Sequence, residues 1–287
     1  MKPVTELYNR HPGSDIYVIG TGASMRVFPE SFLEGRITIG LNMAWKLVPV
    51  TYGITIGPHL NIPEFMPGEA PHPEITWITK RDKARLVLSE EQFEHADRNF
   101  YEFTTQLSKG PNTDEVDAGR IVDFVRTPTG LMLYQWSSIS QTAANLAANM
   151  GAKNVILVGC DNCAVLDNHH AHVQHTKWLS DSPDARYMQY YEGLDEVRAA
   201  LRERGVNLVA LSPFLKLDAP AMDFVRLCDQ LEHPTFLAPS GDISKTDDPR
   251  RLTPARPPSS ASRRSRLRRV RALGRRLQSR SRSAERT

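Results

Sequence analysis

Four histidines stand within seven positions of the chain, namely His169, His170, His172 and His175. A histidine side chain gains or loses its proton near neutral pH, so it can take the proton of a hydroxyl group as a general base. We expect His175 or His172 to have this role. The alternative is a solvated, histidine-rich loop that carries no chemistry.

Two cysteines three positions apart, Cys160 and Cys163, precede these histidines. Thiolate and imidazole groups bind zinc, so the pair forms an alternative metal site with His169 and His172. Cysteines of structural zinc sites usually lie on short knuckles, whereas Cys160 directly follows an apolar run typical of a strand. We therefore expect no metal cofactor and keep a divalent metal as the alternative.

A glycine-containing stretch follows another apolar run, at residues 15–19. Its candidate phosphate-binding residues are Gly20, Thr21, Gly22 and Ser24. Glycines let the backbone approach a ligand closely, and backbone N–H groups can face a phosphate. Because a full G-x-G-x-x-G motif is missing, an ordinary turn between a strand and a helix is the alternative.

Other polar residues and glycines stand where strands are expected to end or a helix to begin. These candidates for nucleotide binding are Asn42, Gly57, Gly159 and Asp161 at strand ends, and Ser137 and Ser138 at a helix start. Ligands of open parallel sheets bind at the carboxyl ends of strands, and helix N-termini attract phosphate. Turn residues and a simple N-cap are the alternatives.

Strand and helix patterns alternate along the chain. Apolar runs predict strands at 15–19, 37–41, 51–56, 75–78, 121–125, 155–159 and 206–211, and helical spacing predicts helices at 139–150 and 190–204. This alternation predicts an α/β fold, a Rossmann-like parallel sheet with covering helices. Residues 62–130 are less regular, and we expect them to be an insertion or lid over the site.

The formal net charge of +3 combines two parts of opposite sign. Residues 245–287 hold one Lys and fourteen Arg against three carboxylates, a net charge of +12, whereas residues 1–244 hold 21 basic and 30 acidic side chains. We expect residues 1–244 to be one nucleotide-sugar-binding domain. The Pro-, Ser- and Arg-rich residues 245–287 are predicted to be a disordered tail that binds an anionic membrane surface or nucleic acid.

The expected location is the cytoplasm. The sequence has no apolar run of membrane-spanning length and no signal-peptide core near its start, so we expect no transmembrane segment. Three cysteines in 287 residues fit a reducing compartment. The basic tail adds the possibility of a peripheral position on the inner membrane.

The order of these motifs resembles two related groups of proteins. The motifs are residues 20–24, Asn42, the helix that begins at Ser138, the strand end at 159–161 and the sequence Leu-Ser-Pro at 211–213. One group is the bacterial family-42 sialyltransferases, which use CMP-sialic acid without a metal. The other includes archaeal 6-hydroxymethylpterin diphosphokinase and glycosyltransferase-like proteins of bacteria and phages. The resemblance covers roughly residues 15–60 and 130–215 and implies a variant of the GT-A fold.

The resemblance also implies site roles. The stretch 20–24 would lie along the nucleotide phosphates, and Asn42 would contact the nucleotide sugar. Ser138 would bind the phosphate or the base, and Asp161 would shape the site near the ribose or base.

The chain departs from the sialyltransferases where their general base stands, shortly before the penultimate helix. Residues 185–190 hold no histidine. We expect Arg186 to stabilise the charge of the departing phosphate, with Tyr187 and Tyr190 as alternatives for that role. The resemblance implies inversion at the anomeric carbon.

We therefore expect a glycosyltransferase that moves a sugar from a CMP- or UDP-activated donor to a hydroxyl group of a glycan, lipid-linked or protein acceptor. One alternative is metal-dependent pyrophosphoryl transfer to a pterin-like alcohol, although residues 57–59 lack the acidic cluster of the diphosphokinase group. A non-enzymatic alternative is binding of nucleic acid or an anionic surface through the basic tail.

Overall fold

The computed structural model describes residues 1–211 except 27, 106–122, 137, 163–170 and 172–182. All described residues belong to the first of two compact units, Met1–Ala255. The domain boundary expected after residue 244 and the basic tail lie outside the described residues, so both stay predictions.

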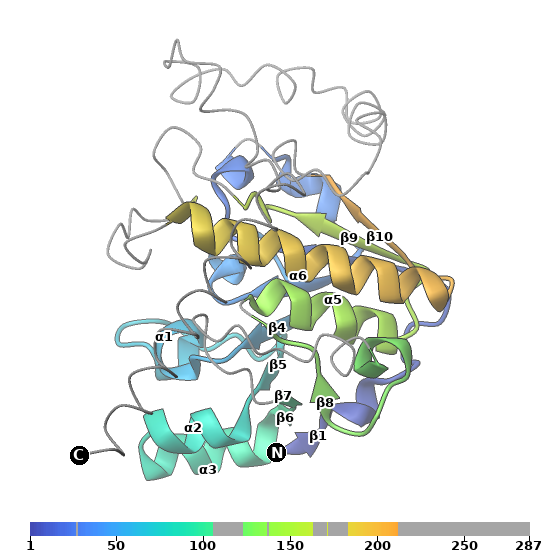
Figure 1. Cartoon of the computed structure of the whole chain (residues 1–287). Coiled ribbons are helices and arrows are strands. Elements are labelled where there is room, and N and C mark those ends of the chain that lie inside the picture. The colour runs from blue at the N-terminus through green and yellow to red at the C-terminus, as the bar shows by residue number, and fades with distance from the viewer. Residues whose placement is uncertain (27, 106–122, 137, 163–170, 172–182, 212–287) are drawn as a thin grey trace, which may run out of the picture. The chain divides into compact units, whose positions relative to one another are not determined.

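The core of the fold is an eight-stranded sheet in which every strand pair is parallel (Figure 1). In chain order the strands are β1 (Lys2–Pro3), β2 (Asp15–Ile19), β3 (Ile37–Leu41), β4 (Tyr52–Thr55), β5 (Thr76–Thr79), β6 (Tyr101–Glu102), β9 (Asn154–Val158) and β10 (Asn207–Ala210). Their spatial order is β1-β6-β5-β4-β3-β2-β9-β10. A small second sheet pairs β7 (Thr104–Thr105) with β8 (Met132–Leu133). The predicted α/β fold with a parallel sheet is confirmed.

Helices connect the strands. The α-helices are α1 (Pro58–Asn61), α2 (Arg81–Val87), α3 (Glu90–Asn99), α5 (Ile139–Asn149) and α6 (Pro183–Glu203). Short 3-10 helices are η1 (Val4–Leu7), η2 (Ala23–Arg26), η3 (Glu30–Leu33), η4 (Ala44–Lys46) and η5 (Pro63–Phe65). No helix within the described ranges is long and apolar enough to cross a membrane.

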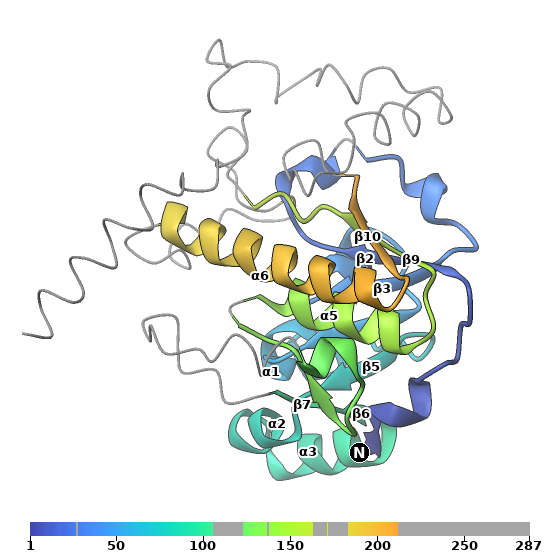
Figure 2. The same ribbon diagram turned by 45° about the vertical axis from the view of Figure 1, so that its right-hand side comes forward.

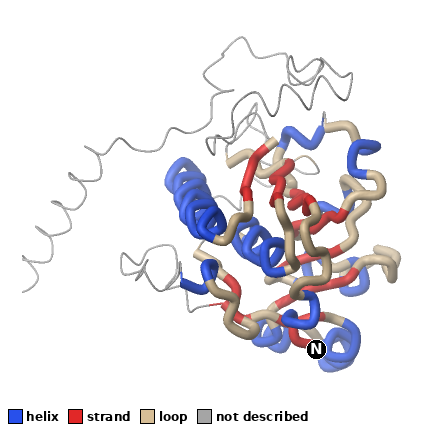
Figure 3. Tube along the Cα trace, turned by 90° about the vertical axis from the view of Figure 1, so that its right-hand side faces the viewer, coloured by secondary structure: helices blue, strands red, loops and turns tan. Residues whose placement is uncertain are grey.

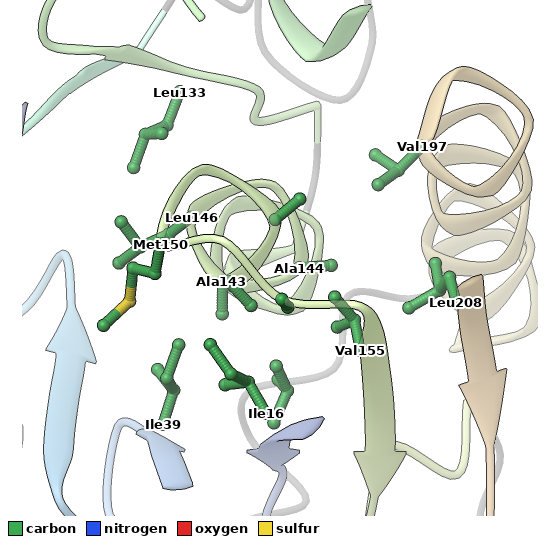
Figure 4. Close-up of a cluster of buried hydrophobic side chains, with 14 of the residues drawn as sticks. Ile16, Ile39, Leu133, Ala143, Ala144, Leu146, Met150, Val155, Val197 and Leu208 are labelled. Atoms are coloured by element: carbon green, nitrogen blue, oxygen red, sulfur yellow. The ribbon is translucent and has the colours of Figure 1, made fainter. Parts of the chain in front are cut away.

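The long helices α5 and α6 lie side by side on one face of the sheet (Figures 1 and 2). Ala143 of α5 and Met150, which directly follows this helix, pack on Ile16 and Ile39, and Val197 of α6 packs in the same cluster (Figure 4). Alternate strand residues point to opposite faces of a sheet, so these helices cover only half of the core.

The opposite face is covered by shorter elements. Tyr17 and Ile19 of β2 and Trp77 of β5 are buried there against residues of η2, η4, η5 and α3. Figure 3 shows the strands between the two long helices on one side and the short helical segments on the other. The sheet is therefore buried on both faces, which explains why its strands read as nearly continuous apolar runs.

The structure corrects the interpretation of residues 62–130. This part of the chain contributes β5 and β6 to the main sheet and α2 and α3 to its cover, so its described residues are integral to the fold. The expected strand at 121–125 is also corrected, because residues 123–126 are helical. Val125 is buried, and its carbonyl accepts a hydrogen bond from Arg204 at 2.8 Å. Residues 106–122 lie outside the described part.

Candidate functional site

The chain changes direction across the sheet at β2. From β2 it adds β3, β4, β5 and β6 on one side, and it then returns through α5 to β9 on the other side. Such a topological switch point is where open parallel sheets bind ligands, at the carboxyl ends of the strands. The ends of β2 and β9 therefore form the candidate ligand site.

Helix α5 begins at the same edge of the sheet. Its C-terminal carbonyl groups accept hydrogen bonds from the segment before β2: Asn149 from Asn9 N–H and Met150 from His11 N–H, both at 2.8 Å. The C-terminus of α5 thus lies at the amino edge of the strands, and its N-terminus lies at the carboxyl edge. A helix N-terminus at that edge can attract an anion.

The loops that follow β2 and β9 interlock through backbone hydrogen bonds. Gly20 N–H donates to the Val158 carbonyl at 2.7 Å, and Gly22 N–H donates to the Gly159 carbonyl at 2.8 Å. A Cβ atom on Gly20 would lie 2.3 Å from the Gly159 carbonyl oxygen, and one on Gly22 would lie 2.5 Å from Asp161 Oδ2. Only glycine permits the two loops to approach so closely.

Ser24 and Asp161 close the same pair of loops. Ser24 Oγ donates to Asp161 Oδ1 at 2.5 Å, and Ser24 N–H donates to Asp161 Oδ2 at 2.8 Å. Both residues are only 3% exposed. In this arrangement the donors of Gly20, Gly22 and Ser24 are satisfied within the protein, which fits the strand-to-helix turn. Phosphate binding by these three groups stays a prediction.

Two asparagines in the left-handed backbone conformation flank the β2 loop. Asn42 follows β3 with φ of 51°, and Asn162 lies just after β9 with φ of 52°. The third described non-glycine residue of this kind, Asn9, precedes β2 at the opposite edge. Positive φ is uncommon outside glycine and is often found at binding sites. Asn42 and Asn162 therefore mark the edge where β3, β2 and β9 end.

The side chain of Asn42 is held by a network of polar groups. Asn42 Oδ1 accepts from Thr55 Oγ1 at 3.0 Å, and Thr55 Oγ1 in turn accepts from Asn61 Nδ2 at 2.9 Å and from Gly57 N–H at 3.0 Å. The Asn42 amide nitrogen has no partner among the described residues, and Asn162 Nδ2 is enclosed without one. The Asn42 amide therefore has N–H donors left for a ligand, whereas a ligand could reach Asn162 Nδ2 only if the residues that enclose it moved.

The start of α5 is a capping box. Ser138 Oγ accepts from Ser140 N–H at 3.2 Å, and Gln141 Oε1 accepts from Ser138 N–H at 3.4 Å and Trp136 N–H at 3.1 Å. The N-cap predicted for Ser138 is confirmed. Ser137 lies outside the described residues.

Cys160 is a buried thiol behind the interlocked loops. It is 7% exposed, and burial raises its pKa to about 12, with a further contribution from the nearby Asp161 carboxylate. A thiol in this state is a poor nucleophile and a poor metal ligand. Within the described ranges no group of three metal-binding side chains occurs. The other residues of the alternative zinc site, Cys163, His169 and His172, lie outside those ranges.

The predicted catalytic residues are only partly described. His172 and His175 lie outside the described residues, as do the side chains of Arg186 and Tyr187 on α6. Tyr190 is half-buried, and its carbonyl accepts a hydrogen bond from Gln141 Nε2 at 3.3 Å. This bond places the first half of α6 beside the N-terminus of α5.

Comparison with known proteins gives no relative. No family model, curated protein or solved structure matches this chain.

Three residues of this edge were not predicted from the sequence. Asn162 directly follows the predicted Asp161, and its place after a buried strand was an available signal. Thr55 is a polar residue at the end of an apolar run, and it is fully buried. Asn61 belongs to a four-residue helix, which is too short to leave a periodic pattern.

Proposed function

We propose that the protein binds a nucleotide-activated sugar at the carboxyl ends of β2, β3 and β9 and transfers the sugar to a hydroxyl acceptor. The observation that carries the proposal is the pair Asn42 and Asn162, held at positive φ on either side of the β2 loop at the switch point. Amide groups can both donate to and accept from a base or a ribose.

The N-terminus of α5 supplies the electrostatic part of the proposal. The departing nucleotide phosphate gains negative charge as the glycosidic bond breaks, and the positive end of a helix dipole stabilises that charge. The α5 start lies at the same sheet edge as the two asparagines, and Arg186 stands in the sequence of the adjoining helix α6.

The resemblance to family-42 sialyltransferases supports the same reaction class. It favours a CMP- or UDP-linked donor, a GT-A-like variant of the Rossmann-like fold and transfer without a metal. A position near the inner membrane, mediated by the basic tail, would bring the enzyme to lipid-linked acceptors.

Donor turnover tests the proposal. The full chain is incubated with CMP- and UDP-linked sugars, with and without EDTA, and release of free nucleotide is followed by chromatography. We expect release from at least one donor that EDTA does not reduce. Turnover of ATP with a pterin-like alcohol that EDTA abolishes would instead establish the pyrophosphoryl transferase alternative, and turnover of no nucleotide would contradict both.

A further inference from the structure

We propose that His59 is the general base that takes the proton from the acceptor hydroxyl group. The inference rests on the proposed transfer reaction and places its acceptor end over β3 and β4. The sequence pointed instead to His172 or His175, which stand after β9.

His59 lies at the same edge of the sheet as the proposed donor site. It belongs to α1, which follows the carboxyl end of β4 directly. Neighbouring strands are about 4.8 Å apart, so β4 lies roughly 10 Å from β2 across the sheet, on the side of Asn42. The proposal places the base and ribose of the donor on the β9 side, near Asn162, and the transferred sugar on the β3 side, next to β4.

The short helix that carries His59 is firmly anchored. Asn61 Nδ2 donates to Thr55 Oγ1 and to the Gly57 carbonyl, each at 2.9 Å, and the Asn61 carbonyl accepts from Trp45 Nε1 at 2.7 Å. The same Thr55 hydroxyl bonds to Asn42. One network therefore positions both His59 and an asparagine of the donor site, as a site on rigid support requires.

His59 differs from the other described histidines in its hydrogen bonding. The ring of His11 bonds to Tyr52 at 2.8 Å, that of His72 to Glu74 at 2.7 Å and that of His95 to Asn99 at 3.3 Å. Neither ring nitrogen of His59 has a partner among the described residues, and Nδ1 is enclosed. An enclosed polar atom without a partner is costly and calls for a functional explanation. An acceptor cannot reach the enclosed Nδ1, so the base of the proposed step is Nε2, which has no hydrogen-bond partner among the described residues.

The proposed step is a single displacement. The acceptor oxygen forms a bond to the anomeric carbon while the bond from that carbon to the phosphate oxygen breaks. The electron pair of the broken bond leaves on the nucleotide phosphate, and the acceptor proton moves to the His59 ring. With water as the acceptor, the same step hydrolyses the donor.

Donor hydrolysis by the full chain tests this assignment, using whichever CMP- or UDP-linked sugar the wild type turns over. General bases contribute typically 10²- to 10⁴-fold, so we expect His59→Gln to slow nucleotide release by at least about 100-fold. The dissociation constant of the donor should stay within about twofold. His11→Gln is the matched control, since it makes the same change at the amino edge of the sheet, and it should leave hydrolysis unchanged.

Chemical rescue separates a base from a structural residue. In His59→Ala, added imidazole should restore hydrolysis in proportion to its concentration, because it supplies the missing proton acceptor. The inference would be overturned if His59→Gln bound the donor and hydrolysed it at the wild-type rate. It would also be overturned if His175→Gln or His172→Gln lost hydrolysis and His59→Gln did not. Either result would leave the proposed function standing. If the wild type binds no nucleotide sugar, the proposed function fails and this inference fails with it.

Discussion

A few residues hold together the two loops that follow β2 and β9. Ser24 and Asp161 form two buried hydrogen bonds between loops that are 137 positions apart in the sequence. The glycines beside them have no room for a side chain. These residues therefore cross-link the loops and fix the ends of β2 and β9. We propose that the neighbouring asparagines, and not these residues, contact the ligand.

Asp161→Ala should destabilise the protein strongly. It leaves the N–H and the hydroxyl of Ser24 buried without an acceptor, so we expect a loss of about 3 kcal/mol in the free energy of unfolding. Urea denaturation measures this. Asp15→Ala is the control, because Asp15 is exposed and accepts one bond from Asn154 at the opposite end of the strand pair. An equal loss of unfolding free energy in the two variants would show that the hydrogen bonds between Ser24 and Asp161 do not stabilise the loops.

Cys160 should resist alkylation in the folded protein. Its pKa is raised from 9.0 to about 12, so at pH 8 the thiolate population falls about 1,000-fold. We expect iodoacetamide to leave Cys160 unmodified under native conditions and to label it rapidly in urea, as mapped by peptide mass spectrometry. Native labelling as fast as labelling in urea would show that this thiol is not buried.

The raised pKa of Cys160 should also make the free energy of unfolding depend on pH. Between pH 9 and 12 the unfolded chain has lost the Cys160 proton, while the folded chain still holds it. Folding then retains a proton that unfolding releases, so the Cys160 contribution to stability falls as pH rises through this window.

The strands and helices that are long enough to show a hydrophobic pattern could be predicted from the sequence, and the two-residue strands could not. The strands at 15–19 and 37–41 have the predicted bounds, and α5 ends at Asn149, just before Met150 and Gly151, whose φ is 98°. The two-residue strands β1 and β6 are too short to show a periodicity. Pairing with β5 makes β6 a strand, and that tertiary effect is invisible in the local sequence.

For the candidate site, the sequence predicts that Asn42 and Asp161 follow the ends of strands, and the structure has both residues there. Their nucleotide-binding roles stay predictions. Asn162 and His59 were missed because a positive φ and an enclosed ring nitrogen depend on how distant segments pack.

The contact between α5 and α6 should be sensitive to one added methyl group. A Cβ on Gly193 of α6 would lie 2.0 Å from Gln141 Nε2, an amide fixed by hydrogen bonds to Tyr190 and Trp136. Helix propensity alone predicts that Gly193→Ala stabilises by about 1 kcal/mol. We instead expect a loss of about 2 kcal/mol in unfolding free energy, because the added group overpacks the contact.

A double-mutant cycle isolates this effect. In the Gln141→Ala background the obstructing amide is gone, so Gly193→Ala should become neutral or stabilising in urea denaturation. The same loss in both backgrounds would mean that the contact does not set the spacing of the helices.

At the scale of the whole molecule, charge separates the chain into an acidic body and a tail with a net charge of +12. We expect the full chain to sediment with vesicles that contain anionic lipid at low salt, and to be released at high salt as the charges are screened. Neutral vesicles are the control. Binding to both kinds of vesicle, or preferential competition by duplex DNA, would contradict a membrane role for the tail.

Nucleotide binding to two glycine variants tests the central claim most directly. Asn42→Gly and Asn9→Gly both remove an amide side chain from a left-handed position that glycine tolerates, one at the proposed site and one at the opposite edge. Isothermal titration with CMP, UDP and their sugar conjugates compares both with the wild type. We predict that a pyrimidine nucleotide binds the wild type and Asn9→Gly equally, and that Asn42→Gly binds it at least about tenfold more weakly, a loss of about 1.4 kcal/mol. Asn42→Gly should also lower Tm, because the buried Thr55 hydroxyl loses its acceptor, so binding is compared at a temperature where all three proteins are folded. Equal binding by Asn42→Gly, or no nucleotide binding by the wild type, would contradict a nucleotide site at the carboxyl edge of β2.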